Sequence, residues 1–287
     1  MRRPGISTII IFHGRFQHLL MLLSGLEQGN IIPNEVILIE MDVEKSIIPN
    51  FELPINHILL PISNSSNLPI AEARNLGAIW SKFEILTFLD VDCIPSKEYI
   101  SEITNIKLKN NAIYMGYPKY LEVPINEIDF DFLSEKSIYH PLRPNQECIR
   151  KIDDYGMFWS LTFFLNYKTF SAIDGFDTLY SGYGAEDTDF AFKAQALNMD
   201  FYITPFKVYH QQHSFCRPPL NSMKAIVKNS NHFYKKWQFW PMENYLRDFA
   251  DRELISWNRK QTKPIEVTNH PSKSEIENSR ILDEPYA

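Results

Sequence analysis

Long apolar runs are missing from the sequence, and cysteine is scarce. No stretch reaches the ~18–20 consecutive apolar residues of a membrane-spanning helix, and the early run STIIIF (7–12) is too short for a signal peptide. The three cysteines, Cys93, Cys148 and Cys216, are odd in number, widely spaced and without zinc-site spacing. We therefore expect a cytoplasmic protein with no transmembrane segment and no disulfide framework. Peripheral contact with a membrane stays an open alternative.

Excess positive charge and glycine-rich phosphate loops are also missing. The chain has 29 basic and 35 acidic residues, a net charge of −6, which does not indicate a nucleic-acid partner. After the first apolar run, FHGRFQ (12–17) stands where a G-x-G-x-x-G or P-loop sequence would be expected. A phosphate group would then be held by a metal ion and arginine. Arg15 and Arg74 are the candidates, although a surface role is the commoner one for either.

Apolar runs and amphipathic segments alternate along the chain. Runs typical of buried strands cover 7–12, 34–42, 55–62 and 83–92. Segments with helical spacing lie between them, at 13–29 and 69–82, so the order predicts a parallel sheet with crossover helices. Farther along, helices are expected at 96–108, 186–197 and 221–237, and strands at 111–121, 156–170 and 200–214, the last as a strand pair.

Two parts of the chain lack this periodicity. Residues 122–155 are irregular and rich in proline, asparagine and charge, and loops of that length are often functional lids. Residues 259–287 are polar and aperiodic, so we expect a flexible tail. The expected fold is a single α/β domain in which helices flank a Rossmann-like, mostly parallel sheet, with a helical extension at the C-terminus.

Two aspartates follow the fourth apolar run. Asp90 and Asp92 are expected at the carboxyl end of a parallel strand, where open α/β sheets bind ligands. Residues two apart on a strand face the same side, and two carboxylates that point one way repel each other unless a cation lies between them. A solvated strand end or a helix cap is the simpler alternative.

A second acidic cluster lies in SGYGAEDTDFAFKAQAL, at 181–197. Glu186, Asp187 and Asp189 stand at the start of an expected helix, where the helix dipole favours an acid by ~0.3–1 kcal/mol. A cap needs one acid and does not need a glycine on each side of Tyr183. The cluster therefore fits a structural role and a chemical role equally well, with Asp189 assigned to capping or packing.

Two histidines, His210 and His213, stand three residues apart in VYHQQHS. An isolated histidine is more often a packed or surface residue than a ligand. Paired histidines together with an acid at a sheet edge suit a divalent ion, and one carboxylate with one or two imidazoles is compatible with Mn2+. Zinc and iron remain alternatives on ligand type alone.

Four segments, taken in order, resemble GT-A-type glycosyltransferases that use nucleotide sugars. FHGRFQHL (12–19) resembles the Phe-Arg-Asn-Arg-x-x-His-Leu segment of the β-1,4-galactosyltransferases, and FLDVD (88–92) resembles their metal-binding acids. GYGAEDTDFAFKA (182–194) resembles their Gly-Trp-Gly-Gly-Glu-Asp-Asp-Asp run, and HQQH (210–213) has the spacing of their Met-x-x-His segment. Two runs, VYHQQHSFCRPP (208–219) and NSNHFYKKWQFWPMENYLRDF (229–249), are similar to bacterial enzymes that join a family-two donor half to a galactosyltransferase-like C-terminal half, which is the closer match.

The resemblance implies a donor site and a metal site. Asp92 would bind Mn2+ or Mg2+ with His213, and His210 would stand where the galactosyltransferases use methionine. Asp90 would face the ribose or the metal, and Glu40 or Asp42 the uracil or the ribose. The full set of implied donor contacts is Phe12, Arg15, Glu40, Asp42, Arg74, Asp90 and Asp92.

The resemblance also implies an acceptor site. Asp187 matches the catalytic base, Glu186 a contact to the acceptor sugar, and Tyr183, next to Gly184, the tryptophan that stacks on that sugar. Three departures bear on donor identity and acceptor fit, since His13 replaces an arginine, Tyr183 a tryptophan and Ala185 a glycine.

The function implied is metal-dependent, inverting transfer of a sugar from a UDP-sugar to a hydroxyl group of a glycan or other acceptor. Residues 1–115 would bind the nucleotide sugar, 116–215 would bind the acceptor and carry catalysis, and 216–258 would form a helical segment before the tail. Two alternatives stay open. A sugar-nucleotidyltransferase would need the missing glycine-rich loop, and an inactive carbohydrate-binding scaffold would not need the acids and histidines.

Overall fold

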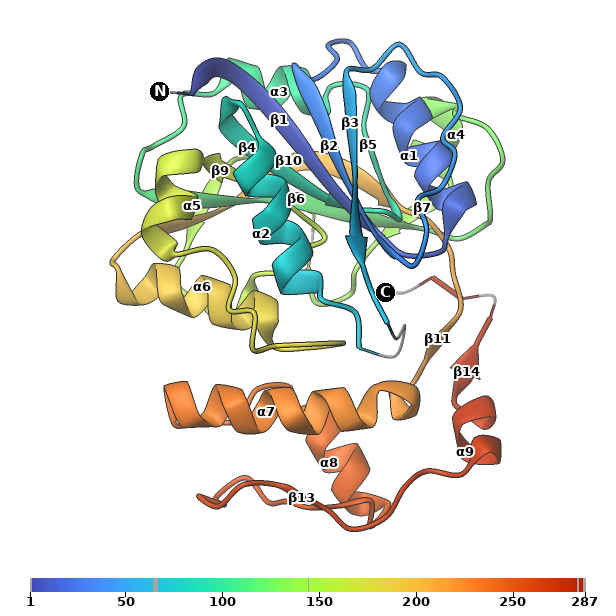
Figure 1. Ribbon diagram of the computed structural model, residues 1–287, viewed down its shortest axis with the longest axis vertical. Helices are drawn as coiled ribbons and strands as arrows, with labels where there is room; N and C mark the ends of the chain where they lie inside the picture. Colours follow the sequence, from blue (N-terminus) through green and yellow to red (C-terminus); the bar gives the residue numbers. More distant parts are fainter. Residues whose placement is uncertain (1, 64–66, 144, 283, 286–287) are drawn as a thin grey trace.

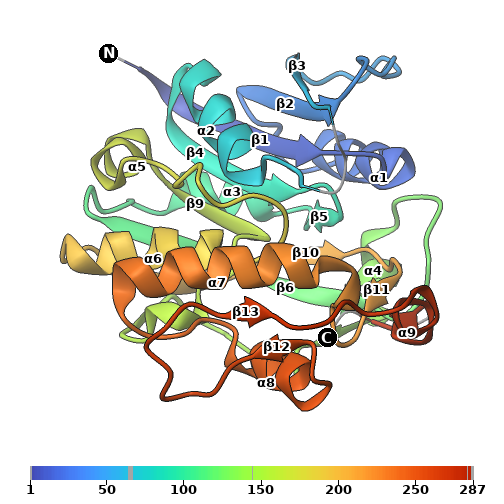
Figure 2. The same cartoon turned by 60° about the horizontal axis from the view of Figure 1, so that its bottom comes forward.

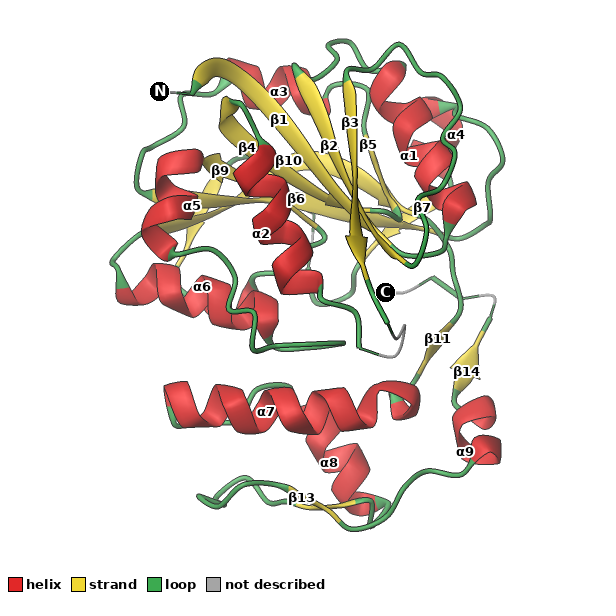
Figure 3. Cartoon of the chain, in the orientation of Figure 1, coloured by secondary structure: helices red, strands yellow, loops and turns green. Residues whose placement is uncertain are grey.

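The protein is built around one large sheet. The computed structural model describes all residues except 1, 64–66, 144, 283 and 286–287. In the described part of the chain, a 10-stranded sheet forms the centre, with helices on either side (Figures 1 and 3). Its main path runs β3-β2-β1-β4-β9-β6-β10-β5, with β7 paired to β6 and β8 to β10. The α/β fold predicted from the sequence is thus confirmed.

The strands of the N-terminal half are parallel, as the alternating runs predicted. Strands β3, β2, β1 and β4 pair in parallel, β6 and β10 also pair in parallel, and β9 is antiparallel to β4 and β6. The strands are β1 (Arg3–Phe12), β2 (Glu35–Asp42), β3 (Ile55–Pro61), β4 (Phe83–Asp90), β5 (Cys93–Pro95), β6 (Ala112–Leu121), β7 (Ser137–Tyr139), β8 (Arg150–Ile152), β9 (Thr162–Asn166) and β10 (Asp200–His210).

Both faces of the sheet are buried, which explains the continuous apolar runs. Along β1, Ile9 and Ile11 enter one core cluster, while Ile10 and Phe12 enter the other. Burying a side chain of this size stabilises the fold by roughly 1.5–3 kcal/mol. Helices α2 (Ile70–Trp80), α5 (Tyr167–Ile173) and α6 (Glu186–Ala196) cover the first cluster, and α1 (Phe16–Glu27) and α3 (Tyr99–Asn105) cover the second.

The C-terminal part forms its own apolar cluster below the sheet in Figure 1. Buried residues including Ile226, Leu246 and Ile265 make this cluster. Figures 1 and 2 both show α7 running alongside α6. The elements here are β11 (Phe215–Cys216), α7 (Met223–Trp237), α8 (Glu243–Asp251), β12 (Ile255–Ser256), β13 (Glu266–Val267), α9 (Lys273–Asn278) and β14 (Arg280–Ile281).

Three local predictions differ from the structure. The strand expected over 156–170 is limited to β9, because the chain enters α5 at Tyr167. The strand pair expected over 200–214 is the single strand β10, whose register with β6 shifts around Pro205, a residue without the N–H that ladder pairing uses. The loop at 122–155 contains α4 (Phe130–Glu135), β7 and β8.

The segment 259–287, expected to be a flexible tail, contains β13, α9 and β14, which pairs with β11. These elements have only two to six residues, too few to show a periodic pattern in the sequence. The division of the chain into functional segments stays a prediction. Among the described residues, no helix combines the length and apolar character needed to cross a bilayer.

Candidate active site

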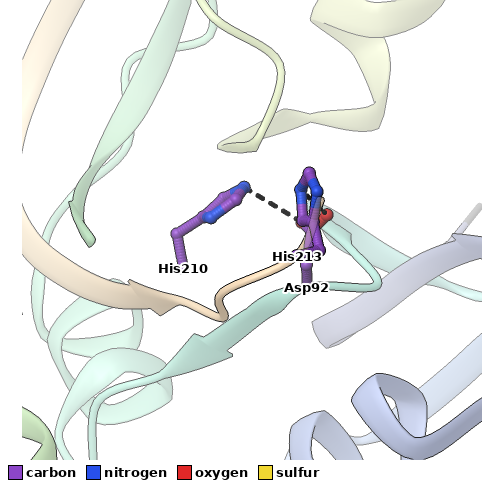
Figure 4. Close-up of side chains that lie close together, drawn as sticks. All are labelled: Asp92, His210 and His213. Atoms are coloured by element: carbon purple, nitrogen blue, oxygen red, sulfur yellow. Dashed lines mark ion pairs between the residues drawn. The ribbon is translucent and has the colours of Figure 1, made fainter. Parts of the chain in front are cut away.

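Asp92, His210 and His213 come together at the edge of the sheet (Figure 4). The Oδ1 atom of Asp92 lies 3.6 Å from Nε2 of His210, and its Oδ2 atom lies 3.4 Å from Nε2 of His213. One ligand atom from each residue can be chosen so that all three lie within 4.8 Å of one another. The structure thus brings together the three residues that the sequence assigned to a metal.

The local fold explains this meeting. The chain leaves β4 at Asp90, turns through Val91 and Asp92, and enters β5, which pairs antiparallel with β10 so that Cys93 lies opposite His210. The backbone N–H of Gln211 donates to the carbonyl of Asp92 at 2.7 Å and fixes the two segments to each other. Asp92 therefore lies in a turn, so the argument from strand alternation does not apply to it.

The charges in this cluster fit a divalent ion. Burial alone would raise the pKa of Asp92, but His210, His213 and Arg15 outweigh it and hold the pKa well below its usual value. Burial lowers the pKa of His210 to about 4, so its imidazole is neutral near pH 7 and able to act as a ligand. One ionised carboxylate with neutral imidazole is a donor set that divalent transition ions accept.

Arg15 lies beside the cluster, at the start of α1. Its backbone is in the left-handed region, with φ 42°. Its guanidinium donates to Oδ2 of Asp92 and lies 3.3 Å from Nδ1 of His213. This placement agrees with a role next to the diphosphate of a donor, and that role stays a prediction.

Arg74 links the two acidic segments of the sequence. Its side chain is 3% exposed, and its guanidinium donates to Asp90 at 3.0 Å and to Glu186 at 3.2 Å. The sequence assigned Arg74 to the nucleotide, but the structure shows it engaged by protein carboxylates, so a nucleotide contact stays a prediction. The structure therefore brings the end of β4 next to the start of α6.

Glu186 and Asp187 are the first two residues of α6, and the pKa of each is raised. Burial, and then the charge of Asp187, raises the pKa of Glu186, and burial raises the pKa of Asp187 despite Arg74. Asp187 accepts a hydrogen bond from the backbone of Thr188 at 2.7 Å. Among the described residues, Oε2 of Glu186 is buried and has no hydrogen-bond partner. A substrate hydroxyl group could donate to such an oxygen.

The loop before α6 has a tight backbone. Gly182, Gly184 and Ala185 have φ values of 71°, 101° and 71°, a region that side chains other than hydrogen disfavour. Ala185 thus adopts a glycine-like conformation where the galactosyltransferases have glycine. Tyr183, between the two glycines, is 38% exposed, which leaves its ring open to a ligand.

The residues assigned to the base and ribose lie in different surroundings. Glu40 is 1% exposed and binds groups of its own chain, since it accepts from the hydroxyl and backbone N–H of Ser46 and lies 2.8 Å from Nε2 of His57. Asp42 is more exposed and lies 3.4 Å from Nδ1 of His13. Phe12 is buried in the core. Of Glu40 and Asp42, the half-buried Asp42 is better placed to meet a ligand.

A row of aromatic rings, which the sequence did not predict, connects the cluster of Asp92, His210 and His213 with the 122–155 loop. The ring of Tyr120 lies 5.1 Å from His210 and 5.9 Å from His140, and His140 packs edge-on against Trp159 at 4.9 Å. The guanidinium of Arg143 lies 3.4 Å from the centre of the Trp159 ring. These residues come from separate segments, and no spacing in the sequence connects them.

His18 also lies at the cluster, and no role was predicted for it from the sequence. Its Nε2 atom is 3.1 Å from the carbonyl of Gln212, and its ring is 6.4 Å from that of His213. Its position in FHGRFQHL, one turn after Arg15, was the available signal.

Comparison with known proteins gives a family match and several similar structures. Residues 147–214 match the family model described as the N-terminal domain of galactosyltransferase. No curated protein matches the sequence. Crystal structures of S. aureus TarS are similar: one has 14% identity and a TM-score of 0.52, covering 88% of this chain and 44% of that one. Another, in complex with UDP-GlcNAc, has 14% identity and a TM-score of 0.51, and the match covers 72% of this chain and 58% of that one.

A crystal structure of GalNAc-T7 with UDP, GalNAc and Mn2+ is matched with 15% identity and a TM-score of 0.49, covering 81% of this chain and 50% of that one. The chain thus spans about half the length of the solved structures it matches. The comparisons confirm the predicted α/β fold and the predicted galactosyltransferase-like segment. The matched segment contains the α6 acids and both histidines.

Proposed function

We propose that the protein is a metal-dependent, inverting glycosyltransferase that moves a sugar from a UDP-sugar to a hydroxyl acceptor. The observation that carries this proposal is the contact of Arg74 with both Asp90 and Glu186. It joins the sheet edge that carries Asp92, His210 and His213 to the carboxylates of α6. A transferase needs this arrangement, because the leaving group and the attacking hydroxyl must meet at one carbon atom.

The donor side would hold a divalent ion through Asp92, His213 and His210, with Mn2+ as the first candidate and Mg2+ less suited to imidazole ligands. Such an ion supplies charge stabilisation to the diphosphate that departs. Arg15 contributes a second positive charge at the same place. A UDP-sugar is supported by the similarity to a structure in complex with UDP-GlcNAc.

The acceptor side would supply the base. Asp187 would accept the proton of the acceptor hydroxyl group while its oxygen bonds to the anomeric carbon and the bond from that carbon to the diphosphate oxygen breaks, with the electron pair leaving on the diphosphate. A positioned base contributes about 10²–10⁴-fold to such a rate. Glu186 would accept a hydrogen bond from the acceptor sugar, and Tyr183 would stack on its face.

The 122–155 loop would cover the donor or admit the acceptor. Its residues His140 and Arg143 pack against Trp159, next to Ser160, whose backbone contacts Asp187. The loop therefore lies against the site rather than away from it. A cytoplasmic location is a further part of the proposal that rests on the sequence alone, and peripheral membrane contact stays open.

Release of UDP from a panel of UDP-sugars, with Mn2+ or with chelator and without acceptor, tests this function. We expect slow hydrolysis of one donor that depends on Mn2+. Pyrophosphate formed from UTP and a sugar phosphate would instead identify a nucleotidyltransferase. If no donor is hydrolysed and UDP with Mn2+ does not bind, the transferase proposal is wrong, and binding of glycans without metal would point to a scaffold.

A further inference from the structure

The loop Ser181–Ala185, which we name the acceptor loop, depends on contacts from the C-terminal segment. Three of its residues have positive φ, so its backbone follows neither a strand nor a helix. Its carbonyl groups therefore need hydrogen-bond donors from elsewhere. Helix α7 carries none of the acids or histidines of the site, but it supplies these donors.

Asn229 on α7 is the main donor. Its side chain is 0% exposed, and its Nδ2 atom lies 2.9 Å from the carbonyl of Gly184, 3.2 Å from that of Ser181 and 3.3 Å from that of Tyr183. Its Oδ1 atom accepts from the backbone N–H of Ser181 at 3.4 Å. One side chain thus contacts the backbone on both sides of the Tyr183 ring.

Close packing keeps the loop against this helix. A Cβ atom built on Gly182 would lie 2.9 Å from Cβ of Ala225, and one built on Gly184 would lie 2.7 Å from Sδ of Met242. Both distances are too short for ordinary contacts. The loop therefore packs against Ala225 on α7 and Met242 at the start of α8 with no space for a side chain at either glycine, and the hydrogen bonds of Asn229 hold its backbone to α7.

We propose that Asn229 is a positioning residue for acceptor binding. It holds the carbonyl groups of Tyr183 and Gly184, which fixes the exposed Tyr183 ring relative to Glu186 and Asp187 at the start of α6. Donor binding, which uses the edge of β4 and the histidines, does not involve this contact. The inference rests on the proposed function, because it assigns acceptor binding to the loop.

Asn231 provides a matched control on the same helix. Its Nδ2 atom donates to the carbonyl of Ile265 at 3.0 Å, and its Oδ1 atom accepts from the N–H of the same residue at 2.7 Å. It therefore makes the same kind of contact with a segment outside the site. Asn229→Ala removes four hydrogen-bond contacts to the backbone and Asn231→Ala removes two, but only the first frees the acceptor loop.

The test measures UDP release with Mn2+ and the donor that the wild type hydrolyses, with and without p-nitrophenyl glycosides of common hexoses as acceptors. For Asn229→Ala we expect the acceptor KM to rise at least tenfold while the donor KM and acceptor-free hydrolysis stay within twofold. Asn231→Ala should leave all three within twofold. Donor and acceptor KM that rise together in Asn229→Ala, or an unchanged acceptor KM, would overturn the inference.

Hydrogen exchange of the 181–186 amides decides the structural part without any substrate. We expect at least tenfold faster exchange there in Asn229→Ala and no change in Asn231→Ala; equal exchange would contradict the inference. If Asn229→Ala fails to fold, Lys228→Ala replaces it, since Nζ of Lys228 reaches Oγ of Ser181 at 2.9 Å from an exposed position. If the wild type releases no UDP from any donor and UDP with Mn2+ does not bind, the proposed function fails, and the exchange result still shows whether Asn229 holds the loop.

Discussion

Asp92 and Asp187 are carboxylates in opposite electrostatic surroundings. Around Asp92, His210, His213 and Arg15 hold the pKa low, so the carboxylate stays ionised. Around Asp187, burial raises the pKa, and its nearest acidic neighbour, Glu186, has a raised pKa as well. A group that binds a cation must be ionised, whereas a base must be able to take up a proton near working pH. The difference agrees with the proposed roles, in which Asp92 binds a cation and Asp187 acts as the base.

Asp187→Asn is the strongest test of this comparison. It keeps the shape of the side chain but removes the ability to take a proton, so we expect turnover to fall by about 10²–10⁴-fold. Binding of UDP with Mn2+, measured by calorimetry, should change by less than twofold. Asp248→Asn, an exposed acid on α8, is the control and should keep full turnover. Unchanged turnover in Asp187→Asn would remove this residue from the mechanism.

Asp92→Asn, in contrast to Asp187→Asn, should weaken metal binding. It removes the negative charge that two histidines and Arg15 surround, so we expect binding of Mn2+, followed by calorimetry or by its paramagnetic signal, to weaken at least tenfold. UDP binding should then lose its dependence on Mn2+. If Mn2+ binds Asp92→Asn as it binds the wild type, the metal site lies elsewhere.

The position of Asp92 was easier to predict from the sequence than the contacts around α6, for a physical reason. Continuous apolar runs fix β1 and β4, and the ends of parallel strands meet at one edge, so Asp92 could be assigned from its place after β4. The meeting of Arg74 with Glu186, and of Asn229 with the acceptor loop, depends on how helices pack against each other. These contacts join residues more than 40 positions apart, and no local pattern signals them.

Asp189, the third acid in the first turn of α6, lies in different surroundings from Asp92 and Asp187. Asp189 is 0% exposed and contacts Lys236 at 2.6 Å, Trp237 at 2.8 Å and Tyr180 at 3.2 Å. This agrees with the packing role expected from the sequence. Asp189 therefore connects α6 to α7 and takes no part in the proposed chemistry.

Lys236→Met should accordingly reduce stability and leave the chemistry intact. Removing one partner of a buried ion pair costs about 3–5 kcal/mol. We expect the lower end, roughly 3 kcal/mol, because Lys236 is partly exposed and Asp189 keeps its bonds to Trp237 and Tyr180. Urea unfolding measures the loss, with the exposed neighbour Lys235→Met as control. Donor hydrolysis is measured at about 15–20 °C, where most domains are near their maximum stability, so that the variant stays folded. A loss of hydrolysis under these conditions would instead give Asp189 a role in the site.

The smallest expected effect is a shift in pH dependence, and it tests the electrostatics of Asp187 directly. The base acts only when ionised, so hydrolysis should be lost as pH falls through its pKa. Because burial raises that pKa, the midpoint of the acidic limb should lie above the ordinary aspartate value of about 3.9. Like charges raise each other's pKa, so Glu186→Gln should move the limb to lower pH. A limb that stays in place in Glu186→Gln would mean that another group controls it. The pH profile of Mn2+ binding, measured separately, distinguishes titration of the base from loss of the metal.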